Sequence, residues 1–174
     1  MKLTILLLIF LFSNCYAYTI NENKIDAICN ELKIDDCQLV KAIIKIESNF
    51  NTQAQGRDGK GSYGLMQIKC STALKFGVNK CSDLYDPKVN ILYGMKYIDH
   101  LKELLNTDNV DYILSAYNGG YTYLRKEDRY AIKKCNSISK QKGRKCEAGE
   151  PFNIEYIKKA KIVYNRYDND TDQK

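Results

Sequence analysis

The sequence contains a single histidine, His100, and none of its seven cysteines form a C-x-x-C pair. Structural zinc sites are built from closely spaced cysteines and histidines. His100 lies in a strongly helical stretch without a neighbouring cysteine, so we expect no metal site and no cofactor. Proline is also scarce, and no Pro/Gly-rich linker, internal repeat or low-complexity tract divides the chain. A single compact domain is therefore the expected organisation.

Long hydrophobic runs are absent apart from one, Ile5 to Phe12. That run is too short to cross a bilayer as a helix, which needs about 20 residues. One positive charge precedes it and the small residue Ala17 follows, a pattern typical of a secretory signal peptide. We expect residues 1–17 to be removed and residues 18–174 to form one exported domain, periplasmic or secreted, without a stable membrane span. Two alternatives remain, a lipidated Cys15 and a buried N-terminal helix.

The charge balance is modestly positive, with a formal net charge of +6. Such a surface can bind a polyanionic partner such as a cell-wall polymer or a nucleic acid, or it can simply be solvated. The lysines are scattered along the chain rather than concentrated in one stripe, so we expect no nucleic-acid binding.

Without Cys15, an even number of cysteines remains in the expected mature chain. In an exported protein this pattern indicates a disulfide framework. Sequence alone does not determine the connectivity, but neighbouring cysteines bracket predicted turns or loops between or beside helices. We expect these neighbours to pair, as Cys29 with Cys37, Cys70 with Cys81, and Cys135 with Cys146.

Helical periodicity dominates the chain, which predicts a mainly α fold with little β structure. The stretch from Asn51 to Gly64 is rich in Asn, Ser, Gly and Gln, which predicts an exposed loop. Residues 121–150 show no clear pattern. The polar tail 168–174 is expected to fray. The predicted helices are 24–32 capped by Asn23, 37–47 after Asp36, 71–76 before Gly77, 87–106 starting at Asp86-Pro87, a helix capped by Asp108 or Asn109 that ends at Tyr117, and 153–167.

A carboxyl group lies on the apolar face of the helix over residues 37–47. Val40, Ile43, Ile44 and Glu47 fall at spacings of one helical face, whereas Lys41 and Lys45 fall on the other. Partial burial raises the pKa of a carboxyl group, as a general acid working near neutral pH requires. The periodicity alone is equally compatible with a structural Glu47 that binds a backbone group.

Three motifs occur in order along the chain, Glu47-Ser48-Asn49-Phe50, then Gly61-Ser62-Tyr63-Gly64-Leu65-Met66-Gln67-Ile68, then Ala116-Tyr117-Asn118-Gly119-Gly120. With Asp86-Pro87, Asn90-Ile91, Gly94 and a late tyrosine near Tyr156, they resemble the soluble lytic transglycosylase family, whose catalytic domain is similar to goose-type lysozyme. The resemblance covers about residues 30–165. It implies a lysozyme-like α-helical domain with a catalytic cleft.

By this resemblance Glu47 is the single catalytic carboxylate, which protonates the glycosidic oxygen between N-acetylmuramic acid and N-acetylglucosamine and then acts as a base. The C6 hydroxyl of the muramic residue would attack its own anomeric carbon and leave a 1,6-anhydromuramic end. This differs from the two-carboxylate arrangement of most glycosidases. In agreement, the next acidic residue after Glu47 is Asp58, in the predicted loop.

The resemblance also implies roles for the residues around Glu47. Ser48 would bind substrate or position the loop, or else only end the helix. Tyr117 and Asn118 would contact the acid and the acetamido group, and Tyr156, with Tyr164 as its substitute, would hydrogen-bond Glu47. In the central motif Gly64 would allow close backbone approach, Gln67 would bind an N-acetyl or hydroxyl group, and Met66 would form an apolar wall for a sugar ring unless it fills the core, the commoner use of methionine.

Two features depart from the family pattern. The segment before Tyr156 reads Phe152-Asn153-Ile154-Glu155 in place of the usual acidic residue and spacing, and the stretch from Tyr121 to Pro151 is longer than in minimal members. Small exported members of this kind resemble the specialised transglycosylases of secretion, conjugation or pilus systems, which implies assembly components as partners beside the glycan strands. We expect a monomer. A hydrolytic lysozyme and a non-catalytic wall-binding factor remain as alternative functions.

Overall fold

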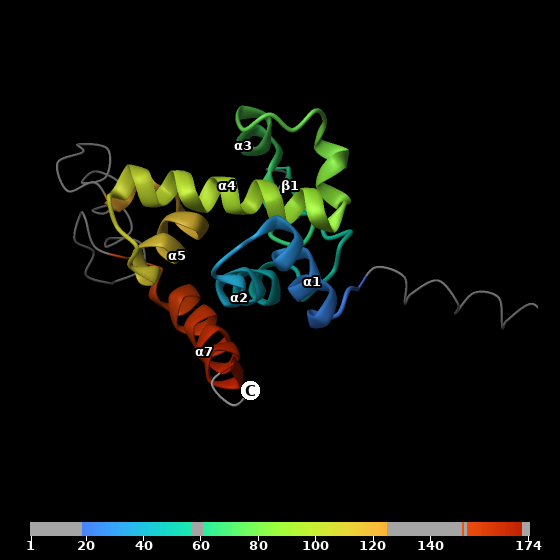
Figure 1. The fold of residues 1–174 in the computed structure, drawn as a ribbon. Coiled ribbons are helices and arrows are strands. Elements are labelled where there is room, and N and C mark those ends of the chain that lie inside the picture. Colours follow the sequence, from blue (N-terminus) through green and yellow to red (C-terminus); the bar gives the residue numbers. More distant parts are fainter. Residues whose placement is uncertain (1–18, 57–60, 125–150, 152, 172–174) are drawn as a thin grey trace, which may run out of the picture.

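The computed structural model describes residues 19–56, 61–124, 151 and 153–171. Helices make up most of this part of the chain, as predicted, and the long helix α4 crosses the molecule above α1 and α2 while α7 runs below them (Figure 1). The helices are α1 (Glu22–Leu32), α2 (Cys37–Glu47), α3 (Cys70–Lys75), α4 (Pro87–Leu105), α5 (Val110–Gly119) and α7 (Ile154–Thr171), with short 3₁₀ turns η1 (Cys81–Tyr85) and η2 (Tyr121–Leu124).

Polar side chains cap four of these helices by accepting a hydrogen bond from a backbone N–H in the first turn. Asp36, Asp86 and Asn109 do so at α2, α4 and α5, at 2.9 Å each, as the sequence predicts. The predicted cap of α1 was wrong. The Asn21 Oδ1, rather than Asn23, accepts from Lys24 N at 3.0 Å, and Asn23 lies inside the first turn.

The C-terminal helix is longer than predicted. α7 continues past the expected end at Tyr167 to Thr171, because the polar residues that follow Tyr167 include no glycine or proline to stop it. Residues 168–171 of the tail that was expected to fray are helical in this structure, and residues 172–174 lie outside the described part of the chain.

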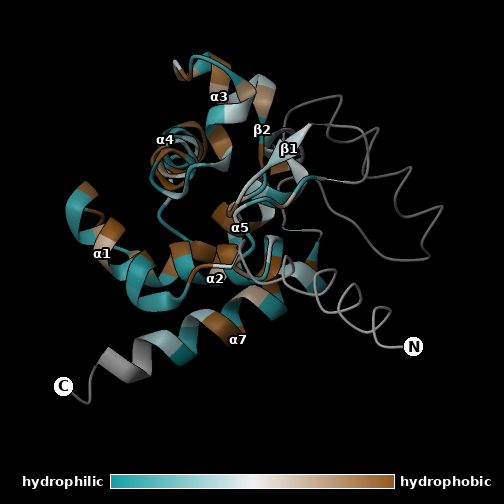
Figure 2. Ribbon diagram, turned by 90° about the vertical axis from the view of Figure 1, so that its right-hand side faces the viewer, coloured by the Kyte–Doolittle hydropathy of each residue, from teal (hydrophilic) through white to brown (hydrophobic). Residues whose placement is uncertain are grey.

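Helix α2 is the centre of the core. Leu39, Val40, Ala42, Ile43 and Ile44 are all at most 1% exposed. In both ribbon views α2 lies between α4 and α7, and its hydrophobic residues stand out in Figure 2. Burial of one such side chain stabilises a fold by about 1.5 to 3 kcal/mol. A helix that is apolar over so much of its circumference is held firmly, so the residue at its end has a fixed position.

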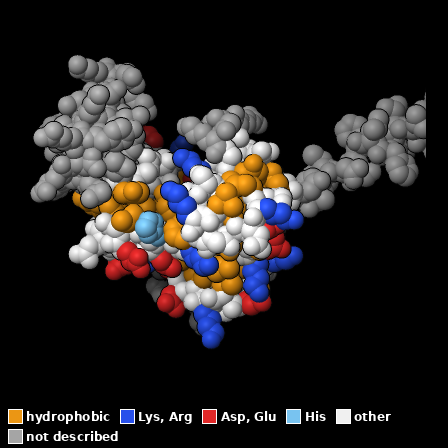
Figure 3. Space-filling model, turned by 90° about the horizontal axis from the view of Figure 1, so that it is seen from above, with side chains coloured by type: hydrophobic (Ala, Val, Ile, Leu, Met, Phe, Trp, Pro, Cys, Tyr) orange, Lys and Arg blue, Asp and Glu red, His pale blue; other side chains and the backbone are white. Residues whose placement is uncertain are grey.

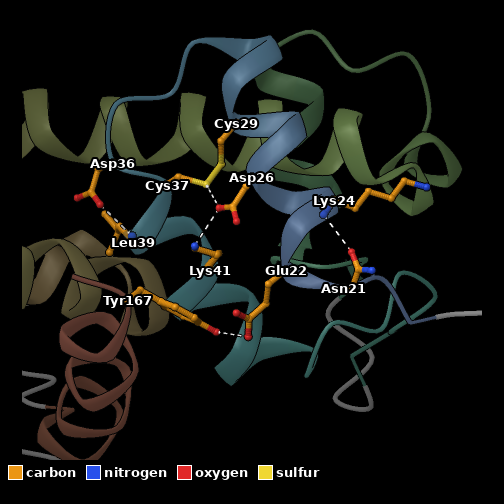
Figure 4. A network of polar contacts seen from close by, with 10 residues as sticks. All are labelled: Asn21, Glu22, Lys24, Asp26, Cys29, Asp36, Cys37, Leu39, Lys41 and Tyr167. Carbon is orange, nitrogen blue, oxygen red and sulfur yellow. Dashed lines mark hydrogen bonds and ion pairs between the residues drawn. A yellow bond between two sulfur atoms is a disulfide. The ribbon is translucent and has the colours of Figure 1, made fainter. Parts of the chain in front are cut away.

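Polar contacts join α7 to the two N-terminal helices (Figure 4). Lys41 Nζ lies 2.9 Å from Asp26 Oδ1 on α1 and 4.6 Å from the ring centre of Tyr167 on α7. The Tyr167 hydroxyl donates to Glu22 Oε1 at 2.7 Å, and burial raises the pKa of this tyrosine, which therefore remains a donor. Lys41 was expected on the outer face, but its side chain is only 12% exposed because α7 packs against α2 there.

The loop between α2 and α3 contains the only sheet in the described residues. Strands β1 (Ser62–Tyr63) and β2 (Ile68–Lys69) pair antiparallel, with Ser62 opposite Lys69. Further isolated bridges join Thr19 to Asn51 and Gln55 to Tyr63. The segment from Asn51 to Gly64, predicted to be a plain loop, is thus ordered over its described residues by short β pairings.

Two of the three predicted disulfides are confirmed. Cys29 is bonded to Cys37 across the turn between α1 and α2, and Cys70 to Cys81 between α3 and η1. Cys135 and Cys146 lie outside the described residues.

Within the described part of the chain, no helix is both long and apolar enough to span a membrane. The face seen in Figure 3 carries both lysine and acidic side chains among uncharged surface.

A buried asparagine on α4 fixes the turn between β1 and β2. Asn90 is fully buried, and its Oδ1 accepts from Met66 N at 2.7 Å. Its Nδ2 donates to the carbonyl oxygens of Tyr63 at 2.8 Å and Leu84 at 2.7 Å. Every polar atom of this buried amide is therefore paired, which a buried amide requires to be favourable.

We predict that Gly64→Ala destabilises the protein far more than Gly77→Ala. Both glycines have a left-handed φ, +70° and +94°, so both variants carry backbone strain. A Cβ at Gly77 meets nothing within 4 Å, whereas one at Gly64 would lie 2.1 Å from Leu84 O and 2.3 Å from Asn90 Nδ2. Gly64→Ala should cost about 3 kcal/mol more of unfolding free energy in urea denaturation with disulfides intact. Equal losses would contradict this role of Gly64.

Candidate active site

Glu47 is the last residue of α2, where the helix ends in a sharp turn. Ser48 caps the helix, and Asn49 and Phe50 both have left-handed φ values, 49° and 65°. The Ser48 hydroxyl donates to Ile44 O at 3.1 Å, so in this structure it serves the helix end, the structural role considered for it. The turn leads the chain away from Glu47, and its side chain remains partly buried at the end of the apolar helix.

A tyrosine hydroxyl from the far end of the chain meets this carboxyl group. Tyr156 on α7 donates to Glu47 Oε1 at 2.7 Å, across 109 residues of sequence. Of the two candidate tyrosines it is Tyr156 that reaches Glu47, because Tyr164 lies two turns further along α7 and donates to Asp36 Oδ2 at 3.5 Å. Because burial favours the neutral acid, it raises the pKa of Glu47, and the hydrogen bond from Tyr156 offsets part of this rise.

Tyr117 on α5 completes this group. Its hydroxyl donates to the carbonyl oxygen of Met66 at 2.7 Å. Burial, followed by the negative charge of Glu47, holds the pKa of Tyr117 well above its usual range. The same two causes act on Tyr156, where the hydrogen bond to Glu47 adds to them. Both hydroxyls therefore remain protonated donors beside a carboxyl group whose own proton is held more tightly than usual.

A cavity of about 250 Å³ lies along the end of α5 and includes three of the predicted substrate residues, Gln67, Tyr117 and Asn118. Tyr97 contributes to its wall, with its ring centre 5.5 Å from that of Tyr117. The other residues that line it are Ile68, Lys69, Thr72, Gly119 and Gly120. Glu47 and Tyr156 do not line this cavity; Tyr117 is the lining residue that the charge of Glu47 influences.

In the central motif, Gly64, Met66 and Gln67 mainly make contacts within the protein. Met66 is fully buried, and its Sδ occupies the place that a Cβ at Gly94 would take, 2.3 Å away, so it fills the core and does not line the cavity. Gly64 allows close approach as expected, but to Leu84 and Asn90. Gln67, itself at a left-handed φ of 49°, donates through Nε2 to Ala54 O and Gly64 O at 3.0 and 2.9 Å.

The sequence interpretation names Asn90 and Asn153 but gives neither of them a role in the site. Asn90 falls on the buried stripe of α4 with Gly94 and Ile98, and a lone asparagine among apolar positions at helical spacing is a usable signal. Asn153 gives no such signal, since its partners lie on α5. Asp58, the next acidic residue after Glu47, lies outside the described residues. Among the described residues, no group of three or more His, Cys, Asp or Glu side chains could hold a metal ion.

The fold is that of a lysozyme-like lytic transglycosylase domain. The 70 kDa soluble lytic transglycosylase of Escherichia coli superposes with a TM-score of 0.58 at 21% identity, over 86% of this chain and 24% of that one. An inactive mutant of the lytic transglycosylase Slt from Pseudomonas aeruginosa gives 0.57 at 22% identity, over 84% and 24%.

Residues 30–139 match the transglycosylase SLT domain, and the chain belongs to that family. It is 34% identical over 129 residues to the membrane-bound lytic murein transglycosylase E of Buchnera aphidicola from Acyrthosiphon pisum, covering 64% of this chain and 57% of the relative. It is 35% identical over 99 residues to the membrane-bound lytic murein transglycosylase C of Photorhabdus laumondii, covering 49% and 27%. The chain spans a little over half the length of the Buchnera relatives it matches.

We predict that Glu47→Gln stabilises the fold relative to the wild type as pH rises. Because the pKa of Glu47 is raised in the folded state, the unfolded chain releases its proton first. Wild-type stability therefore falls as pH rises from the ordinary carboxyl pKa through the raised one, a loss that a neutral amide does not share. Thermal unfolding across this pH range should show the difference growing with pH and then levelling.

The matched control is Glu103→Gln, which replaces an exposed carboxyl group on α4. A pH-dependent difference of the same size in both variants would show that burial of Glu47 is not its cause.

Proposed function

We propose that this protein is an exported peptidoglycan lytic transglycosylase with Glu47 as its single catalytic carboxylate. The observation that carries the proposal is the environment of that carboxyl group. It is desolvated at the end of a buried helix, accepts a hydrogen bond from the Tyr156 hydroxyl, and is close enough to Tyr117 for its charge to raise the pKa of that tyrosine. Membership of the SLT domain family and relatives named as lytic murein transglycosylases support it.

In the proposed reaction Glu47 gives its proton to the glycosidic oxygen as the bond to the muramic anomeric carbon breaks. The N-acetylglucosamine leaves with that proton as a free hydroxyl. The carboxylate then takes the proton of the muramic C6 hydroxyl, whose oxygen bonds the anomeric carbon and closes the 1,6-anhydro ring. Glu47 ends protonated, and no water is consumed. The raised pKa of Glu47 favours the first step, because the acid must hold its proton near neutral pH.

The hydrogen bond from Tyr156 favours the second step. A hydroxyl that donates to a carboxylate stabilises the charged form, so it supports Glu47 once the proton has left. Burial and this hydrogen bond therefore act in opposite directions on the same group, as a residue that serves first as acid and then as base requires. The role of such an enzyme in the assembly of a secretion, conjugation or pilus system remains the expectation drawn from family resemblance.

The deciding experiment is mass spectrometry of the muropeptides released from purified peptidoglycan. An anhydro end is lighter by one water than the product of hydrolysis. Glu47→Gln should lower turnover by roughly 10² to 10⁴-fold, since the amide keeps the shape of the side chain and has no proton to transfer. Glu103→Gln serves as the control and should retain activity.

Other products would favour the alternatives. Reducing ends would identify a hydrolytic lysozyme of the same fold. Binding to glycan strands without release of any product by the wild type would identify a non-catalytic wall-binding factor. Substantial activity of Glu47→Gln would remove Glu47 from the mechanism.

We predict that Tyr156→Phe moves the alkaline limb of the pH–activity profile to higher pH. The substitution removes the donor that lowers the pKa of Glu47, so the carboxyl group should keep its proton to higher pH. The rate at the optimum should fall, because the carboxylate loses its stabilising partner.

Tyr164→Phe is the matched control, since it removes a hydroxyl from the same helix that donates to Asp36 instead of Glu47. An alkaline limb that stays in place or moves down in Tyr156→Phe would show that this hydrogen bond does not set the proton affinity of Glu47.

A further inference from the structure

The junction between the end of α5 and the start of α7 is held by one side-chain amide, that of Asn153. The buried Ser115 donates through Oγ to Asn153 Oδ1 at 2.6 Å. Asn153 Nδ2 donates to the main-chain carbonyl oxygen of Ser115 at 3.3 Å and to Asn118 Oδ1 at 2.9 Å. The three bonds form a continuous chain from the interior to the surface of the molecule.

These bonds define which way both amides point. The Ser115 carbonyl oxygen can only accept a hydrogen bond, so the atom of Asn153 that faces it must be the NH₂ group. The same NH₂ group faces Asn118, which must therefore present its own oxygen. A main-chain carbonyl thus determines the orientation of Asn153, and Asn153 determines the orientation of Asn118.

Asn118 is left with its NH₂ group for other partners. Its side chain is exposed and lines the cavity that also includes Gln67 and Tyr117. An amide fixed in this way offers a ligand hydrogen-bond donors in place of an acceptor. The ligand group that it fits is a carbonyl or hydroxyl oxygen.

Asn153 is also linked to the tyrosine that contacts Glu47. Its main-chain oxygen accepts from Tyr156 N at 2.9 Å in the first turn of α7. One residue therefore ties together the two helices that supply Asn118 and Tyr156.

We propose that Asn153 is a positioning residue, which fixes Asn118 as a hydrogen-bond donor and thereby selects a substrate that presents an acceptor oxygen, such as an acetamido carbonyl, at this place in the cleft. This inference rests on the proposed function. It adds a specificity determinant outside the motifs that define the family resemblance, and it makes the orientation of the Asn118 amide depend on the residue that directly precedes α7.

The test uses Asn153→Asp, which has nearly the same shape. Its carboxylate can still accept from Ser115 Oγ, but it cannot donate to Asn118 Oδ1 or to the Ser115 main-chain carbonyl oxygen. The Asn118 amide then turns its NH₂ group toward the new carboxylate, and its oxygen faces the ligand. The variant should therefore disfavour an acetamido carbonyl and tolerate an ammonium group, which donates hydrogen bonds.

Binding is measured by calorimetry in the Glu47→Gln background. The probes are a tetrasaccharide of alternating N-acetylglucosamine and N-acetylmuramic acid and its de-N-acetylated counterpart. Asn153→Asp should weaken binding of the acetylated probe by roughly 10-fold and that of the other probe much less. Equal losses for both probes would mean that Asn153 acts only on the fold and would overturn the proposal.

A double-mutant cycle in kcat/KM on peptidoglycan, with Glu47 intact, tests whether Asn153 acts through Asn118. Asn118→Ala and Asn153→Asp should each lower kcat/KM by roughly 10-fold, and the double variant by about the same factor instead of their product. Thermal unfolding of each variant checks that it is folded. Multiplying effects would overturn the proposal.

Wild-type turnover is measured first, which separates the two possible failures. If the wild type neither cleaves peptidoglycan nor binds the acetylated probe, the proposed function fails and this inference fails with it. If the wild type releases anhydro products and Glu47→Gln does not, the proposed function stands, and the cycle and the probe ratio decide on Asn153 alone.

Discussion

Three hydrogen bonds of the Asn90 side chain determine where the candidate active site lies. They bind Tyr63, Leu84 and Met66 to α4 in the interior of the protein. The main-chain carbonyl of Met66 in turn accepts a hydrogen bond from the hydroxyl of Tyr117, whose pKa the charge of Glu47 raises. The close turn at Gly64 is possible only because no Cβ intrudes on Asn90 there. The positions of Met66 and Tyr117 therefore depend on one buried amide in the core, that of Asn90, whose polar atoms are all paired.

Local sequence patterns predicted the elements of this fold well. Helix α2 and its Asp36 cap, the start of α4 at Pro87, and two disulfides follow from rules that act within a few residues. The errors are local too, such as the choice of Asn23 over Asn21 as a cap. Periodicity also placed Glu47 on the buried face, because the face of a helix is determined by spacing alone.

Contacts between distant residues were beyond such rules. Periodicity gives no sign that Asn153 meets Asn118, or that Met66 fills the space left by Gly94 instead of facing a sugar. The contact of Tyr156 with Glu47 came from family resemblance, with Tyr164 as a substitute, and only the packing of α7 on α2 distinguishes the two. Such pairs depend on how the helices pack in the whole fold, so they can be identified only from the three-dimensional structure.

Both disulfides in the described part of the chain join neighbours, whereas α7 is attached to the other described helices by packing and by polar contacts such as those of Tyr156 and Tyr167. The carboxyl group comes from near the start of the domain and its hydroxyl partner from near the end. A nascent chain that emerges N-terminus first has Glu47 long before it has Tyr156. The group around Glu47 is thus completed only once α7 has been synthesised, and a chain cut short before α7 lacks the partner that stabilises the ionised acid.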